Sequence, residues 1–155
     1  MSHKKSARSF NLHVITMNRR KMLEHLILQC YDFFDVIRVC DGGSIDGTKK
    51  MCKKYDVEFR YREWDDNYHE QDNVLLGRCR DGDWVLIMDD DECPSRLLLD
   101  NLRNLVGFAK KNDYNKISLP CILVLDDKTE CELDIFVEET INNKRHPFRN
   151  NWFFE

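Results

Sequence analysis

The sequence lacks the long apolar segments and the leader sequence that mark membrane and secreted proteins. The longest unbroken apolar runs of the 155-residue chain are Trp84–Met88 and Cys121–Leu125. Both are far shorter than the roughly 20 residues that a helix needs to span a bilayer. Residues 1–9 are polar and basic, and no apolar stretch follows them, so they are not a signal peptide. We therefore expect a protein without a transmembrane segment, in which residues 1–9 are disordered.

The sequence also lacks C-x-x-C pairs and an excess of positive charge. Its cysteines number seven, an odd count without zinc-type spacing. Several lie in apolar runs, where a free cysteine packs as a small hydrophobic side chain. This pattern predicts reduced thiols and a cytoplasmic protein. The formal net charge is -4, and because nucleic-acid binders usually carry a basic surface, we expect no nucleic acid among the partners.

Prolines and glycines are scarce as well, at three and six, and neither a repeat nor a linker divides the chain. We therefore predict one domain over residues 1–155. Hydrophobic periodicity predicts strands at 11–16, 35–40, 57–62, 84–88, 116–125 and 131–137. It predicts helices at 19–32, 46–54 and 69–80, and a fourth that follows Pro94 and extends to about residue 109. This alternation predicts an α/β fold of right-handed βαβ units with a mostly parallel central sheet.

Two polar motifs directly follow apolar strands. They are Asp41–Thr48 (DGGSIDGT) and Asp89–Glu92 (DDDE). Since ligands of parallel sheets bind beyond the carboxyl ends of the strands, we predict that the two motifs share one site. In the first motif, Asp41 can accept hydrogen bonds from a base or a ribose, and the glycines allow a close approach of the backbone. The same segment also fits a plain turn in which Asp46 caps the following helix.

The second motif is the densest acidic run in the sequence. Four consecutive acids repel one another unless a cation joins them, and carboxylate oxygens suit Mg²⁺ or Mn²⁺. Because alternate residues of an extended backbone point the same way, Asp89 and Asp91 are predicted to face one ion. The alternative interpretation is a solvated acidic loop.

Taken together, four pieces of the sequence, the third of them in two parts, resemble glycosyltransferase family 2, of the GT-A fold, in the family's order. Ile15–Asn18 (ITMN) resembles the end of the first strand, and Cys40–Thr48 resembles V-D-D-G-S-x-D-G-T. Glu70–Asn73 (EQDN) and Gly82–Trp84 (GDW) resemble E-Q-R-N and G-D-W, and Met88–Glu92 (MDDDE) resembles L-D-A-D-E with its D-x-D motif. The resemblance covers roughly residues 11–110 and implies a Rossmann-like three-layer sandwich.

The chain departs from the family pattern at two positions. The family's second aspartate after the strand is Gly42 here, and the arginine of its R-N pair is Asp72. These changes put the choice and the strength of donor binding in doubt, but they leave Asp89 and Asp91 untouched.

The resemblance implies an inverting glycosyltransferase. Its donor would be a nucleotide-diphosphate sugar, and its acceptor would be a hydroxyl of a saccharide, a lipid or a protein. The implied nucleotide-binding residues are Thr16, Asn18, Asp41, Gly43, Asn73 and Asp89. The implied ligands of a Mn²⁺ or Mg²⁺ ion are Asp89, Asp91 and, as a late ligand, His146. The ion would neutralise charge on the leaving diphosphate.

An inverting transferase also needs a carboxylate that deprotonates the acceptor. The candidates are Asp126, Asp127, Asp134, Glu138 and Glu139. Glu139, with Glu138 beside it, is favoured because the pair follows a predicted strand, although a solvated acidic pair explains it equally well. Residues 11–110 would then bind the nucleotide sugar, and residues 111–155 would form the acceptor side, either minimal or truncated. The alternative function is a catalytically silent nucleotide-sugar-binding or scaffold module.

Overall fold

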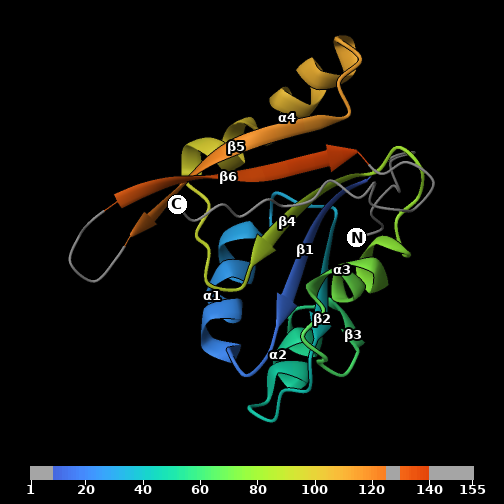
Figure 1. Ribbon diagram of the computed structural model, residues 1–155, viewed down its shortest axis with the longest axis vertical. Helices are drawn as coiled ribbons and strands as arrows, with labels where there is room; N and C mark the ends of the chain where they lie inside the picture. Colours follow the sequence, from blue (N-terminus) through green and yellow to red (C-terminus); the bar gives the residue numbers. More distant parts are fainter. Residues whose placement is uncertain (1–8, 125–129, 140–155) are drawn as a thin grey trace.

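The described residues of the computed structural model, 9–124 and 130–139, form a mixed sheet with helices on both faces (Figure 1). The strands are β1 (Phe10–Thr16), β2 (Val36–Asp41), β3 (Glu58–Tyr61), β4 (Trp84–Asp89), β5 (Lys116–Val124) and β6 (Glu130–Glu139). The helices are α1 (Arg20–Cys30), α2 (Thr48–Lys54), α3 (Tyr68–Leu76) and α4 (Arg96–Lys111). Each predicted element is present, with bounds that shift by a few residues.

The strands are ordered β3-β2-β1-β4-β6-β5 across the sheet. The first four are parallel to one another, whereas β6 runs antiparallel to both β4 and β5. The predicted α/β fold with a mostly parallel sheet is therefore confirmed. β5 and β6 form a long hairpin that extends past the parallel strands (Figure 1).

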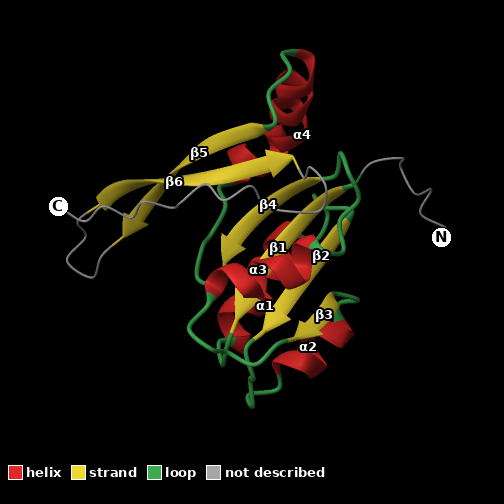
Figure 2. Cartoon of the chain, turned by 45° about the vertical axis from the view of Figure 1, so that its right-hand side comes forward, coloured by secondary structure: helices red, strands yellow, loops and turns green. Residues whose placement is uncertain are grey.

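The sheet and the helices on its two faces form three layers (Figure 2). The helices pack there because both faces of the sheet carry apolar side chains. One face of β1, β2 and β4 packs against α1, α2 and α4, and this core includes Leu12, Val39 and Leu86. On the opposite face, Leu76 and Cys79, at and beyond the end of α3, pack against Val85. Alternation along the strands thus places large aliphatic side chains on the α1 side and a smaller cluster on the α3 side.

Side-chain oxygens fix where the helices start after the strand ends. Asn67 and Ser95 cap α3 and α4 by accepting hydrogen bonds from the backbone three residues later. The second helix begins at Thr48 rather than at the predicted residue 46, because Gly47 adopts a left-handed conformation with φ 90°. Asp46 instead accepts from the N–H of Thr48 at 3.1 Å and from the N–H of Arg20 at 2.8 Å. It thereby ties together the starts of α1 and α2.

The described residues also bear on the thiols and the membrane prediction. Five cysteines there are free, of which only Cys93 is exposed. Within the same residues, no helix is both long enough and apolar enough to cross a membrane.

Candidate functional site

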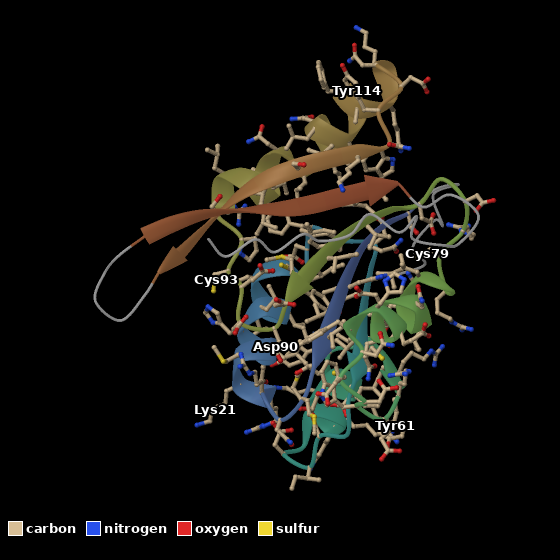
Figure 3. All side chains as sticks on the ribbon, in the orientation of Figure 1. Lys21, Tyr61, Cys79, Asp90, Cys93 and Tyr114 are labelled. Carbon is tan, nitrogen blue, oxygen red and sulfur yellow. The ribbon has the colours of Figure 1, made fainter. Side chains whose placement is uncertain are left out.

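The two polar motifs lie on either side of β1, at one edge of the sheet. Thr16, the last residue of β1, is in register with Asp41 of β2, and Ile15 is in register with Asp89 of β4. Tyr61, the last residue of β3, is in register with Asp41 of the neighbouring strand β2. Asp90 and Tyr61 accordingly lie toward the same end of the molecule (Figure 3). The predicted convergence of the motifs is what parallel pairing produces, since all four strands end at this edge.

Asp41 is buried and holds the glycine-rich loop in place with one of its two carboxylate oxygens. Its Oδ1 accepts hydrogen bonds from the N–H groups of Gly43 and Ser44, at 2.9 and 2.7 Å. Its Oδ2 is buried and has no hydrogen-bond partner. Buried polar atoms are nearly always paired, so this oxygen is an acceptor that a ligand donor would satisfy.

Gly42 has a packing reason to be glycine. A Cβ at this position would lie 3.1 Å from Cβ of Trp64 and 3.4 Å from Sδ of Met17. The backbone N–H of Trp64 also donates to the Gly42 carbonyl at 3.1 Å. Trp64 and Met17 thus close over the backbone where the family pattern has its second aspartate, and an aspartate here would require both side chains to move.

Asn18 connects the loop after β1 to the glycine-rich loop. Its backbone N–H donates to Oγ of Ser44 at 2.7 Å, and its Oδ1 accepts from the N–H of Ile45 at 2.9 Å. It adopts a left-handed conformation with φ 57°, which asparagine tolerates better than most residues. Asn18 therefore shapes the predicted nucleotide pocket through contacts to the protein itself.

The acid cluster, Asp89–Glu92, is a turn rather than an extension of the strand. Asp89 ends β4, and its N–H donates to Oε2 of Glu92 at 2.8 Å while its carbonyl accepts from the Glu92 N–H at 3.2 Å. The backbone at Asp90 and Asp91 is therefore not extended, as the alternation assumed. Asp89 and Asp91 are nevertheless both exposed, and Asp90 between them is buried.

Asp90 anchors the turn to β1. It is 7% exposed, and its Oδ2 accepts a hydrogen bond of 2.6 Å from Oγ1 of the buried Thr16. Thr16, predicted to line the nucleotide pocket, thus uses its hydroxyl to position the acid cluster. This contact fixes the cluster beside the loop that follows β1.

Arg19 is the cation that contacts the acid cluster in the described part of the chain. Its Nη1 donates to Oδ2 of Asp91 and lies 3.5 Å from Oδ1 of Asp90. Arg19 belongs to none of the sequence motifs, although a cation directly after Asn18 was a usable signal. One guanidinium opposite four carboxyls leaves the cluster short of positive charge.

Burial and crowding disfavour ionisation within the cluster. Burial raises the pKa of Asp90, an effect that the Thr16 hydrogen bond and the charge of Arg19 oppose. Burial likewise raises the pKa of Glu92 to about 7, against the effect of the Asp89 N–H. Asp46 behaves differently: burial alone would raise its pKa, but hydrogen bonds from Thr48 and from the Arg20 N–H lower it. Hydrogen bonds therefore outweigh burial at Asp46, whereas they do not do so at Asp90 and Glu92.

The residues present fit a divalent ion that is shared with a phosphate ligand. Within residues 9–124 and 130–139, no group of three or more His, Cys, Asp or Glu side chains forms a complete metal cage. Mg²⁺ typically needs only one or two carboxylates when substrate phosphates complete its shell. The exposed carboxylates of Asp89 and Asp91, in a cluster deficient in positive charge, meet that requirement.

Helix α3 contributes a structural residue that the sequence analysis quoted only as part of a motif. Gln71 is fully buried, its Nε2 donates to the Arg62 carbonyl at 2.8 Å, and its Oε1 accepts from Sγ of Cys40 at 2.6 Å. It thereby ties α3 to the ends of β2 and β3. Asp72 is buried next to it, and Asn73, predicted to bind the nucleotide, is half-buried on the same helix.

The register of β6 places the favoured catalytic bases at the other edge of the sheet. Glu139 and Glu138 pair with Trp84 and Val85, the first residues of β4. Trp84 and Asp89 are the two ends of β4, about 16 Å apart along a strand. This placement argues against either glutamate as the base for chemistry at Asp89. His146, Asp126 and Asp127 lie outside the described residues.

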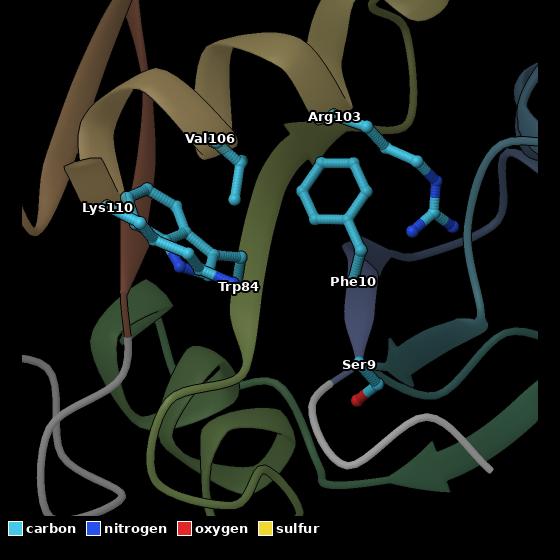
Figure 4. A pocket seen from close by; sticks show the side chains of 7 residues that line it. Ser9, Phe10, Trp84, Arg103, Val106 and Lys110 are labelled. Carbon is cyan, nitrogen blue, oxygen red and sulfur yellow. The ribbon is translucent and has the colours of Figure 1, made fainter.

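A cavity of about 240 Å³ lies away from this site, under α4 (Figure 4). Phe10 and Trp84, which begin β1 and β4, line it together with Arg103 and Lys110. Arg103 already forms an ion pair with Asp35 at 3.2 Å. Because both strands begin here, the cavity is at the amino edge of the sheet and separate from the acid cluster.

Known proteins share this fold. Solved structures that are similar include glucosyl-3-phosphoglycerate synthase from Mycobacterium tuberculosis, in complex with Mn²⁺ and UDP-glucose, with a TM-score of 0.56 at 18% identity over 71% of this chain and 42% of that one. TarS 1–349 of S. aureus gives a TM-score of 0.55 at 20% identity over 69% of this chain and 34% of that one. Such low identities establish the GT-A fold alone.

The sequence comparisons identify the family. An uncharacterized glycosyltransferase of Mycoplasma pneumoniae, the MG060 homolog, is 31% identical over 102 residues, which are 61% of this chain and 30% of that protein. The chain thus spans about a third of the length of this relative. The family model of glycosyl transferase family 2 matches residues 12–154. This match covers nearly the whole chain, and the GT-A sheet brings both motifs to one edge. The chain therefore belongs to glycosyl transferase family 2.

Proposed function

We propose that this chain is the nucleotide-sugar part of an inverting, divalent-metal-dependent glycosyltransferase. The observation that carries the proposal is the placement of Asp41 and the acid cluster on either side of β1, at the carboxyl edge of the sheet. The solved complexes of the M. tuberculosis synthase contain UDP or UDP-glucose with Mn²⁺, which supports a donor and an ion of the same kind here.

Each described residue has a distinct task in this proposal. Oδ2 of Asp41, buried and without a partner, would accept a hydrogen bond from the base or ribose. Asp89 and Asp91 would hold Mn²⁺ or Mg²⁺, while Asp90, bonded to Thr16, keeps their turn in position. The bound ion would supply the positive charge that the leaving diphosphate requires.

In this proposal the catalytic base is neither Glu138 nor Glu139. β6 runs antiparallel to β4, so residues earlier in β6 lie nearer the carboxyl edge. Asp134 is the acid of this kind among the candidates, and it pairs with Pro120 of β5. We therefore propose Asp134 as the base. Asp134→Asn should lower transfer by roughly 10²- to 10⁴-fold, whereas Glu139→Gln, a matched loss of one carboxylate on the same strand, should leave transfer near the wild-type rate.

A silent nucleotide-sugar-binding module is the second candidate. It is favoured by the distance of the two glutamates from the acid cluster. A donor-hydrolysis assay separates the two functions. Nucleotide sugars are first screened by thermal shift with and without Mn²⁺, and each one that binds is then incubated with the protein. Mn²⁺-dependent release of nucleoside diphosphate supports the transferase. Binding without release, also when simple acceptors are added, supports the silent module.

A further inference from the structure

We propose that Arg19 is a donor-binding residue that exchanges partners. In the free protein it pairs with Asp90 and Asp91, and when a divalent ion binds the Asp91 carboxylate its guanidinium moves to the donor diphosphate. This inference rests on the proposed function of the carboxyl-edge site. It gives Arg19 the role of binding the donor diphosphate, a role that no other residue of the proposed site has.

The ion pair is built so that it can be exchanged. Asp90 is the fixed partner, because it is buried and bonded to Thr16. The Arg19 and Asp91 side chains are 49% and 44% exposed, so the second contact is at the surface. Exposed ion pairs contribute little stability, at most a few-fold in an equilibrium. A divalent ion with substrate phosphates can therefore displace the guanidinium at low cost.

Arg19 and a metal ion need the same carboxylate. The Asp91 side chain, whose Oδ2 accepts from Nη1 of Arg19, is 44% exposed and is also a proposed ligand of the ion. An arginine stays protonated under all ordinary conditions, and burial is too slight here to oppose the Asp91 contact, which raises the pKa of Arg19. Since two cations on one carboxylate repel each other, binding of the ion would release the guanidinium.

The released guanidinium has a suitable acceptor nearby. Arg19 directly precedes α1 and follows Asn18, which is bonded to the glycine-rich loop, so its backbone is anchored between the two motifs. A diphosphate bound by an ion at Asp91 would lie within the surroundings of this side chain. The planar guanidinium matches phosphate oxygens in a bidentate manner. Arg19 would thus offset the repulsion between an anionic donor and the surrounding carboxylates.

The test uses Arg19→Met and measures two affinities that the proposal moves in opposite directions. Mn²⁺ binding without nucleotide, measured by electron paramagnetic resonance of the free ion, should tighten about two- to fivefold because a competing surface ion pair is gone. Binding of UDP at saturating Mn²⁺, measured by calorimetry, should weaken roughly tenfold or more because a charge-assisted contact is lost. Arg19→Lys should restore only part of the UDP affinity, since it keeps the charge without the fork.

Lys21→Met is the matched control, because it removes the same charge from an α1 side chain that has no ion pair with the acid cluster in the described structure (Figure 3). Both affinities should stay within about twofold of the wild-type values, because an exposed charge outside the cluster contributes little. If Arg19→Met weakens both affinities, or alters neither, in a variant with wild-type circular dichroism, the partner exchange is wrong while the proposed function stands. If the wild-type protein fails to bind UDP with Mn²⁺, both proposals are wrong.

Discussion

Replacing Asp41 with asparagine separates its structural task from its binding task. The carboxylate uses Oδ1 for two backbone N–H groups and leaves Oδ2 buried without a partner. In Asp41→Asn the amide oxygen can keep both backbone contacts. The amide nitrogen then occupies the position of Oδ2, where it is a donor instead of an acceptor. We therefore expect a folded protein that has lost the acceptor for the nucleotide.

The size of the effect follows from the kind of hydrogen bond. A hydrogen bond to a charged group contributes about 1.5–3 kcal/mol, so UDP should bind to Asp41→Asn about 10- to 100-fold more weakly in calorimetry at fixed Mn²⁺. The affinity for Mn²⁺ alone should stay unchanged, because Asp41 is outside the acid cluster. Equal UDP affinity in the variant and the wild type would refute the assignment of Asp41. Asp41→Ala is a poorer probe, because it also removes the acceptor of the two loop N–H groups and so lowers stability.

Three further predictions concern stability and reactivity. Gly42→Ala should destabilise the fold by about 1 kcal/mol because its Cβ would lie 3.1 Å from Cβ of Trp64, whereas Gly107→Ala should stabilise it by about 0.5–1 kcal/mol since its Cβ meets open space in α4; urea denaturation compares them. Asp46→Ala should cost about 1 kcal/mol at pH 7, and because the folded-state pKa of Asp46 is lowered, the difference from wild type should shrink as pH falls below about 4. In the native protein a thiol reagent should label Cys93 before the other four cysteines of the described residues, as peptide mass spectrometry would show. The described thiols that should react slowly are Cys30, Cys40, Cys52 and Cys79. The thiol prediction is wrong if these buried cysteines are labelled as early as Cys93. The glycine prediction is wrong if Gly42→Ala and Gly107→Ala change the free energy of unfolding equally. The Asp46 prediction is wrong if the stability loss in Asp46→Ala does not depend on pH.

The layout of the parallel sheet was accessible from the sequence because each element has its own periodicity. Trp84–Met88 is a short apolar run between a turn and an acidic motif, and it forms most of β4 as predicted. Asp41 and Asp89 end two strands that are both parallel to β1. The topology alone therefore places both residues at the carboxyl edge of the sheet. This part of the site needed no side-chain detail.

Local details could not be predicted where the backbone stops being regular. The chain turns at Asp90, whose burial against Thr16 depends on a neighbouring strand, so the assumed extended backbone is absent although Asp89 and Asp91 are both exposed. The start of α2 moved because Gly47 takes a positive φ, which periodicity does not encode. Both features depend on contacts between segments that are far apart in the chain.

The position of Glu138 and Glu139 in the sheet could not be predicted for a different reason. A period of two predicts a strand at Glu139 but does not give its direction in the sheet. Because β6 is antiparallel to β4, the residues at its end lie beside Trp84 and not beside Asp89. Arg19 was missed because its significance comes from the two aspartates that it contacts across 71 or more residues of sequence.

The most direct test of the proposed site is to locate a bound ion by NMR. A paramagnetic Mn²⁺ ion broadens the signals of nearby backbone amides, and Mg²⁺ with UDP serves as the diamagnetic reference. With Mn²⁺ and UDP, we predict that broadening is confined to the loops after β1, β2 and β4, at residues 17–19, 42–44 and 90–92. The signals of Phe10 and Gly107, at the amino edge of the sheet and on α4, should remain sharp. Broadening centred on Phe10 and Gly107, or none at 90–92 while UDP is bound, would contradict a metal and nucleotide site at the carboxyl edge.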